Sequence, residues 1–208
     1  MKQVNKSHYN FSEYTDKRRW ASIWHQVDEI CKLSPNTVLE IGPGPGTLKH
    51  IMHSLGINVQ TVDLDPDLSP DYVASVTQLP IQNCSFDLVC AFQVLEHLPF
   101  ESSIIAFSEM VRVAKKYVLI SLPDAQKLWS YSYHVPKQGI KTFHIRKPLD
   151  FAKPAVFDGQ HYWELNKIGF GTERVLSQLL NVSPKIRKVR NFRVTENTYH
   201  HFFLFEKT

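Results

Sequence analysis

Apolar residues recur with a helical period near the start of the chain and then gather into short, nearly continuous runs. Trp20, Ile23, Val27 and Ile30 lie on one helix face and predict a helix over residues 17–33. The remaining pattern predicts helices near 48–55, 104–111 and 172–180, and strands near 36–42, 58–65, 72–75, 86–92, 116–123, 184–194 and 199–207.

The order of these elements indicates an α/β fold. Strands and helices alternate through residue 123, which is typical of a parallel sheet with helices on both faces. The last two strands are separated only by residues 195–198, and so short a connection makes an antiparallel hairpin. We therefore expect a mostly parallel sheet with one reversed strand. A length of 208 residues suits a single domain over 1–208.

One stretch, residues 123–159, fits neither pattern. It combines several prolines with many aromatic residues, and long irregular connections are usually lids, binding loops or disordered segments. The aromatic content argues against disorder. We expect 123–163 to form an aromatic lid or substrate segment in which Trp129, Tyr131, Phe143 and Tyr162 line a cavity. The alternative is a satellite core beneath a long loop. The helix and hairpin of 164–208 complete the chain.

The motif VLEIGPGPGTL places three glycines where a strand leads into a helix. A loop of this kind lets a ligand approach the backbone and the helix N-terminus. Asp63 ends the next strand, 17 residues after Gly46, where α/β folds place an acid that accepts hydrogen bonds from ribose hydroxyls. Glu40 directly before the loop is unfavourable for a pyrophosphate and favourable for an ammonium group. These residues predict a nucleoside that carries a positive charge, not a dinucleotide.

Charge is distributed unevenly along the chain. The net charge is −4 over residues 1–126 and +8 over 127–208. The basic half is either a solvated strand edge or a surface for an anionic substrate or nucleic acid. Because its basic residues are spread out, we favour the solvated edge.

Three features that the sequence lacks bear on its cellular location and on metal binding. The chain has three cysteines without metal-ligand spacing, no apolar stretch of the roughly 20 residues that a membrane helix needs, and no signal-peptide pattern at its start. We therefore expect a cytoplasmic protein without a membrane span, a disulfide framework or a metal site.

Three motifs in series, VLEIGPGPG, TVDLDPDL and LPIQNCSFDLVCAFQVLEHLP, resemble those of class I S-adenosylmethionine-dependent methyltransferases, in the group often labelled methyltransferase type 11. The resemblance covers about residues 37–123. It implies a Rossmann-like sheet of seven strands, mostly parallel with the last strand reversed, and S-adenosylmethionine as cofactor. In this family the protein aligns a nucleophile with the activated methyl group of the sulfonium.

The resemblance also implies roles for single residues. Glu40 matches the acid near the methionine end, and Gln93 matches a position that approaches the same portion of the cofactor. Ser75 stands where the family often has an acid for the adenine amino group, so its hydroxyl or the Val76 amide is expected to replace that acid. The implied cofactor-binding residues are Glu40, Gly42, Gly44, Gly46, Asp63, Leu64, Ser75, Val76 and Gln93.

Methyl transfer often requires a proton acceptor, and QVLEHLP offers Glu96 and His97 at the mouth of the site. His97 is our candidate general base or substrate-orienting residue, because an imidazole can be neutral near physiological pH. The alternative is that His97 packs against, or caps, the helix that follows. His161 and Tyr162 are second candidates.

No residue identifies the methyl acceptor. The chain lacks the [DN]PP[YFW] motif of enzymes that methylate planar amino groups, and it has a compact segment in place of a recognition domain. A small-molecule acceptor is therefore favoured. The alternatives are an RNA or protein methyltransferase that uses the basic C-terminal part, and a noncatalytic cofactor-binding protein.

Overall fold

The computed structural model describes residues 15–208 and contains a seven-stranded sheet with the order β3-β2-β1-β4-β5-β9-β8. The strands are β1 (Thr37–Ile41), β2 (Asn58–Asp63), β3 (Tyr72–Val73), β4 (Phe86–Phe92), β5 (Ala114–Pro123), β8 (Ile186–Arg193) and β9 (His200–Lys207). The pairs from β3 to β5 are parallel, whereas β9 runs antiparallel to both β5 and β8. The expected mostly parallel sheet with a reversed last strand is confirmed.

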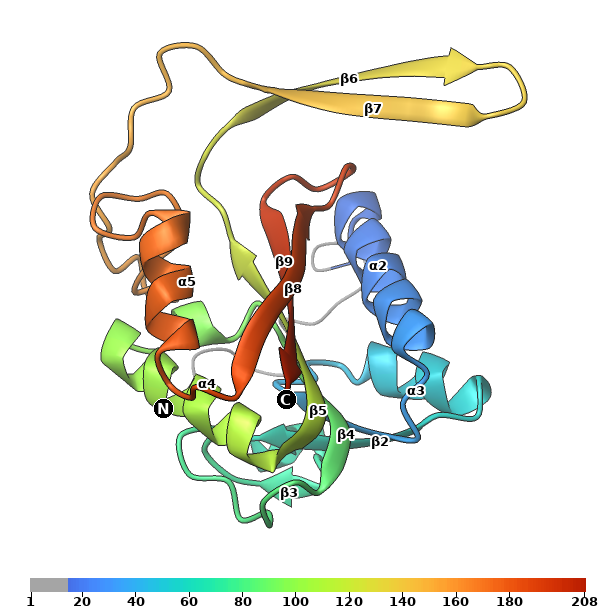
Figure 1. Cartoon of the computed structure of the whole chain (residues 1–208), viewed down its shortest axis with the longest axis vertical. Coiled ribbons are helices and arrows are strands. Elements are labelled where there is room, and N and C mark those ends of the chain that lie inside the picture. Colours follow the sequence, from blue (N-terminus) through green and yellow to red (C-terminus); the bar gives the residue numbers. More distant parts are fainter. Residues whose placement is uncertain (1–14) are drawn as a thin grey trace.

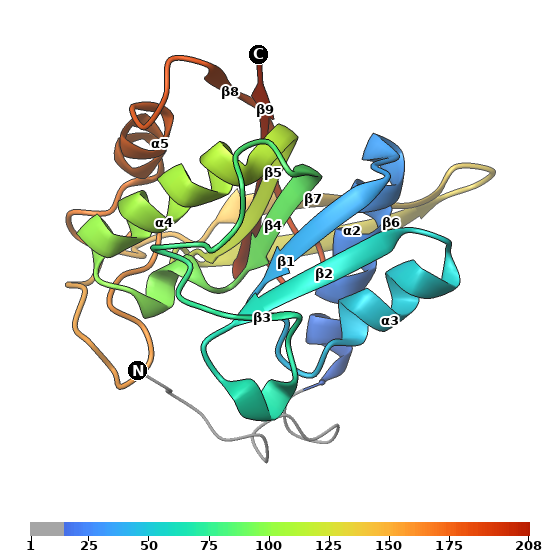
Figure 2. The same cartoon turned by 90° about the horizontal axis from the view of Figure 1, so that it is seen from below.

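Helices cover both faces of this sheet, as Figures 1 and 2 show. One face carries α2 (Lys17–Leu33) and α3 (Thr47–Ser54), and the other carries α4 (Phe100–Val113) and α5 (Thr172–Leu180). Two cores result, one around Ile30, Met52 and Phe202 and the other around Phe107 and Leu179. Among residues 15–208, no helix has both the length and the apolar character needed to cross a membrane.

Local sequence accounts for the helix that becomes one wall of the site. The Asp16 carboxylate accepts a hydrogen bond from the Arg19 amide at 2.8 Å and so caps the first turn of α2. Ser34 ends the helix in the left-handed conformation, with its amide bonded to the Ile30 and Cys31 carbonyls. The cap fixes where α2 begins, and therefore where its first turn meets the sheet.

The segment after β5 is not the irregular stretch expected from the sequence. It forms an antiparallel hairpin of β6 (Leu128–Val135) and β7 (Gly139–Arg146), which projects away from the sheet in Figure 1. The signal was present in LWSYSYHV, where aromatic and polar residues alternate with the strand period of two. Both strands are largely exposed, so the satellite-core alternative is wrong for the hairpin.

After the hairpin, the chain returns to the sheet and is anchored there. Trp163 is 1% exposed, and its indole N–H donates to the Ser103 hydroxyl at 3.1 Å. Asp124, at the end of β5, accepts hydrogen bonds from Asn166 at 2.8 Å and His201 at 2.9 Å. Since loss of a partner from a buried carboxylate is costly, this cluster fixes the return of the chain beside β5 and β9.

Candidate functional site

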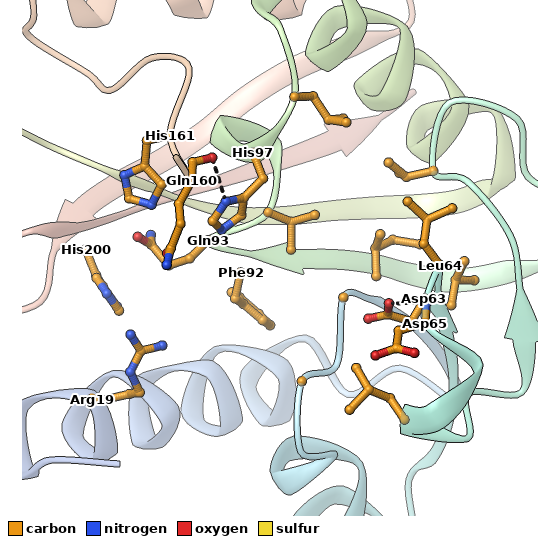
Figure 3. Close-up of a pocket in the computed structure, with 18 of the residues that line it drawn as sticks. Arg19, Asp63, Leu64, Asp65, Phe92, Gln93, His97, Gln160, His161 and His200 are labelled. Carbon is orange, nitrogen blue, oxygen red and sulfur yellow. Dashed lines mark hydrogen bonds between the residues drawn. The ribbon is translucent and has the colours of Figure 1, made fainter. Parts of the chain in front are cut away.

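A cavity of about 730 Å³ opens where β1, β2 and β4 end at their carboxyl edge, a size typical of small-molecule sites. Its walls come from segments far apart in sequence: the start of α2, the loops after the three strands, residues 160–162, and the turn between β8 and β9. Figure 3 shows that its labelled polar side chains form two groups, one with Asp63 and Asp65 and the other rich in histidine.

The acidic end is built by the loop that follows β2. Asp63 and Asp65 both line the cavity, and Leu64 between them is exposed. Burial raises the pKa of Asp63, while the amide N–H groups of Leu64 and Asp65 oppose that shift. The Asp65 amide donates to the Asp63 carboxylate at 2.9 Å, and a carboxylate can accept further hydrogen bonds, such as those from the hydroxyls of a ligand.

The loops after β1 and β4 press against each other at the middle of the cavity. Gly42 has φ +66°, and a Cβ there would lie 2.7 Å from Val94 Cγ2. Gln93 also has a positive φ, +57°, a conformation uncommon for a residue with a side chain. Its amide donates to the Ser121 carbonyl at 3.0 Å and its side chain donates to the Ser121 hydroxyl at 3.2 Å. β5 thus holds the loop that carries Gln93 and Val94 over the glycines.

The histidine end of the cavity is formed by residues from two segments, one after β4 and one after the hairpin. His97 belongs to a short 3₁₀ helix, η3 (Leu95–His97), and its Nδ1 donates to the Gln160 carbonyl at 3.0 Å. Its ring meets His161 edge to face, with centroids 5.0 Å apart. Burial lowers the pKa of His97, which favours the neutral imidazole that a proton acceptor requires.

His161 is held from the other side by acids. Its Nδ1 donates to the Glu164 carboxylate at 3.0 Å, and the Tyr199 hydroxyl donates to the same carboxylate oxygen at 2.8 Å. Burial alone would lower the pKa of His161, but the bond to Glu164 and the nearby Glu96 raise it. The pKa values of His97 and His161 are thus shifted in opposite directions.

Behind these rings lies a buried acid. The Glu96 side chain has no exposed surface, and neither of its carboxylate oxygens has a hydrogen-bond partner among the described residues. Burial raises the pKa of Glu96 to about 8, against the opposing charge of His161. The ligand atoms of Glu96, His97 and His161 lie within 4.8 Å of one another. The sequence does not indicate this cluster, because the hairpin and other elements separate His161 from Glu96 and His97 along the chain.

The cavity includes residues that the sequence analysis did not identify. Arg19 reaches it from α2, and Tyr199 and His200 reach it from the turn before and the start of β9. Burial, followed by the charge of Arg19, lowers the pKa of His200 to about 3, so this imidazole is neutral. No motif marks these positions; only the packing of α2 and β9 beside the loops brings them to the cavity.

Most of the residues named from the sequence lie on the cavity, and three do not. The lining includes Gly42, Gly44, Asp63, Leu64, Val76, Gln93, His97, His161 and Tyr162. Outside it, Gly46 caps α3, and the Ser75 hydroxyl is engaged with the Thr77 hydroxyl at 2.7 Å. Glu40 is also outside, because side chains alternate along β1 and its neighbour Ile41 faces the cavity.

Of the four aromatic residues that we expected to line the cavity, one does and three do not. Tyr162 lines it, where its ring contacts Phe157 at a centroid distance of 4.4 Å. Trp129, Tyr131 and Phe143 belong to the exposed hairpin and are absent from the lining. The expectation therefore holds only for Tyr162, since the strand pairing of β6 and β7 carries the other three rings away from the sheet.

Comparison with known proteins agrees with this geometry. Residues 39–121 match a family described as a methyltransferase domain. No curated protein sequence matches the chain. The matched stretch contains most of β1, all of β2 and β4, and nearly all of β5, and the cavity opens at the carboxyl edge of β1, β2 and β4. The resemblance stated from the sequence motifs is thereby confirmed.

Solved structures share the whole fold at low sequence identity. The PH0226 protein of Pyrococcus horikoshii OT3 has a TM-score of 0.62 and 14% identity, covering 99% of this chain and 100% of that one. The 1,6-didemethyltoxoflavin-N1-methyltransferase of Burkholderia thailandensis, solved with its substrate and S-adenosylhomocysteine, has a TM-score of 0.59 and 17% identity over 97% and 84%. Magnesium protoporphyrin IX methyltransferase of Synechocystis, with S-adenosylhomocysteine, has a TM-score of 0.59 and 14% identity over 96% and 89%.

The contact between Gly42 and Val94 generates a prediction about stability. Gly42→Ala should lower the free energy of unfolding by roughly 1–3 kcal/mol more than Gly56→Ala. Both positions have a positive φ and share the backbone strain of about 1–2 kcal/mol, but nothing lies within 4 Å of a Cβ at Gly56. Urea unfolding of the two variants measures the difference. Adding Val94→Ala should reduce it, and equal losses for the two glycines would contradict the steric account.

The burial of Glu40 generates a prediction about pH. Burial raises its pKa to about 8, partly offset by Lys49, and one of its carboxylate oxygens has no partner among the described residues. The unfolded chain releases this proton near pH 4.5 and the folded chain near pH 8, so the wild-type stability attributable to Glu40 falls as the pH rises between these values.

Glu40→Gln has no proton to lose, so its unfolding free energy should fall less steeply over that range. Between pH 5 and pH 8.5, the unfolding free energy of the variant minus that of wild type should rise by roughly 2–5 kcal/mol. Urea unfolding at the two pH values tests this, with the other buried acid, Glu96, present in both proteins. If the two proteins change in parallel, the Glu40 carboxyl is ionised in the folded state throughout.

Proposed function

With a methyltransferase domain over residues 39–121 as the premise, we propose that the chain binds S-adenosylmethionine in the cavity and transfers its methyl group to a small molecule. The observation that carries the proposal is the division of the cavity into an acidic end at Asp63 and a histidine end at His97 and His161. One end suits the ribose of the cofactor, and the other suits an acceptor that must lose a proton.

The residues present fit this cofactor. Gly42 and Gly44 line the cavity, and a glycine backbone without side chains lets a ligand approach closely. Asp63 offers carboxylate oxygen to hydroxyl donors, and Leu64 and Val76 offer apolar surface for a base. The Burkholderia and Synechocystis relatives were both solved with S-adenosylhomocysteine.

When bound, the cofactor supplies a methyl group already activated by a sulfonium. The task of this chain is then to orient the acceptor, to exclude water and to take up a proton. His97 is the candidate proton acceptor, because its burial favours the neutral ring and the Gln160 carbonyl fixes its plane. Residues 160–162 line the cavity beside it and form the wall that would shield a bound acceptor from water.

A small acceptor suits a cavity of about 730 Å³, and the similar enzymes are named for 1,6-didemethyltoxoflavin and magnesium protoporphyrin IX. The basic C-terminal half gives little support to an RNA acceptor, because Arg187, Arg190 and Arg193 on β8 each pair with an acid.

All three cysteines are free thiols, which is usual for proteins of a reducing compartment, and we retain the cytoplasm as the proposed location.

Calorimetry with S-adenosylhomocysteine, S-adenosylmethionine and NAD tests the cofactor. We expect binding of the two adenosyl ligands and none of NAD; tight binding of NAD alone would contradict the proposal.

Turnover of an acceptor in metabolite extracts with methyl-labelled cofactor then separates an enzyme from a noncatalytic binding protein. Binding to bulk RNA at low salt, where phosphate contacts are strongest, would favour the RNA alternative.

Asp63→Ala should weaken binding of S-adenosylhomocysteine by about 1–3 kcal/mol, roughly 5- to 150-fold, because charge-assisted hydrogen bonds to the ligand are lost. Asp67→Ala is the matched control, since Asp67 lies in the same loop but outside the cavity lining. Calorimetric titration of both variants gives the comparison. An equal loss in both would assign the effect to the fold of the loop and not to a ligand contact.

A further inference from the structure

Glu96, His97 and His161 form a cluster, and Glu96 has no part in the proposed methyl transfer. When His97 coordinates an ion, its ring cannot also take up the proton of the acceptor, and that role passes to another group. Two of the residues are neighbours in η3, and the third arrives from the segment after the hairpin. One ligand atom of each lies within 4.8 Å of the others. We propose that these three side chains bind a divalent transition-metal ion of the zinc type.

The first argument is the state of the Glu96 carboxyl group. It is completely buried, and neither oxygen accepts a hydrogen bond from residues 15–208. Buried acids in proteins are normally paired, hydrogen-bonded or coordinated to a metal, because a buried polar group without a partner costs several kcal/mol. A cation between Glu96 and the two imidazoles would satisfy this group.

The second argument is the way in which both rings are held. Metal-binding histidines usually donate their other ring N–H to a carboxylate or a backbone carbonyl, which fixes the plane of the ring. His161 donates to Glu164, and His97 donates to the Gln160 carbonyl, both at 3.0 Å. Glu164 is itself held by the Tyr199 hydroxyl at 2.8 Å. Each ring thus has one nitrogen held by a partner of the kind that supports a metal-binding histidine.

The donor set selects the kind of ion. Two imidazoles and one carboxylate suit zinc and the neighbouring divalent transition metals, whereas magnesium and calcium prefer sites made of oxygen atoms. Three protein ligands leave a further position for water or a substrate atom. Because His97 and His161 line the cavity, that position faces its histidine end, beside the proposed acceptor site.

A second group of possible ligands shares His161. Asp158, His161 and Glu164 also have ligand atoms within 4.8 Å of one another. Their side chains already have partners, because Asp158 accepts from the amides of Gln160 and His161, and Glu164 accepts from Tyr199. Glu96 lacks such partners, which favours the first group and makes Asp158 a useful control.

The test measures binding of the metal alone, without S-adenosylmethionine, so its result does not depend on the proposed function. Protein without a histidine tag is stripped with a chelator and titrated with Zn²⁺ against a chromophoric indicator, and with Co²⁺ by visible absorption. Wild type should bind one Zn²⁺ per chain, give the absorption of Co²⁺ coordinated by nitrogen and oxygen, and keep its Zn²⁺ in excess Mg²⁺.

Glu96→Gln should weaken Zn²⁺ binding more than about 100-fold, since loss of even a supporting partner typically costs 10- to 100-fold. His161→Gln is a second variant at a less buried position and should behave alike. His144→Ala removes an imidazole on the exposed hairpin, and Asp158→Asn removes the acid of the competing group; both should retain the affinity of wild type. Circular dichroism establishes that each variant is folded.

Absence of stoichiometric Zn²⁺ binding in wild type would overturn the proposal. So would an unchanged affinity in folded Glu96→Gln and His161→Gln. Loss of binding in Asp158→Asn together with retention in Glu96→Gln would place the ion in the competing group, and would equally contradict the assignment to Glu96.

Discussion

The cavity depends on one constraint, which is that parallel strands in register end at the same edge of a sheet. Ile41 of β1 pairs with Val62 of β2 on one side and with Ala91 of β4 on the other. The loops that leave these three strands therefore begin side by side. Gly42, Asp63 and Gln93 are brought together by that register, although they come from three separate stretches of sequence. A ligand bound there is held by three loops on one rigid support.

The remainder of the cavity depends on how the chain comes back after leaving β5. Asp124 binds Asn166 and His201, and Trp163 is buried against the α4 side of the sheet. These contacts return residues 160–162 to the carboxyl edge, opposite the acidic loop. The cavity consequently has two chemically different ends. An acidic end beside apolar residues suits the ribose and base of a nucleoside, and a histidine end suits proton removal.

The sequence predicts the first part of this arrangement well. Buried parallel strands are marked by short apolar runs, and the glycine loop and Asp63 follow two of those strands directly. It predicts the second part poorly, because contacts between distant segments leave no local pattern. His161 reaches His97 only through the path of the return segment. Glu40 illustrates another limit, since the motif identifies the position but strand alternation decides which face its side chain occupies.

The hairpin of β6 and β7 was missed for a different reason. Its alternation of aromatic and polar residues was visible, but neither face of it is buried, so nothing else in the sequence indicated a sheet there. Its prolines and its length suggested an irregular lid. The rings of Tyr131 and Phe143 stack on each other, and these two residues and Trp129 are exposed on the hairpin and absent from the cavity lining.

The central claim is that one cavity holds the adenosyl ligand in a single orientation. A crystal structure of the complex with S-adenosylhomocysteine tests it most directly. The account predicts the ribose hydroxyls on the Asp63 carboxylate, the homocysteine portion over Gly42 and Gly44, and the sulfur turned toward His97 and His161. A ligand bound in the reverse orientation, or outside this cavity, would contradict it.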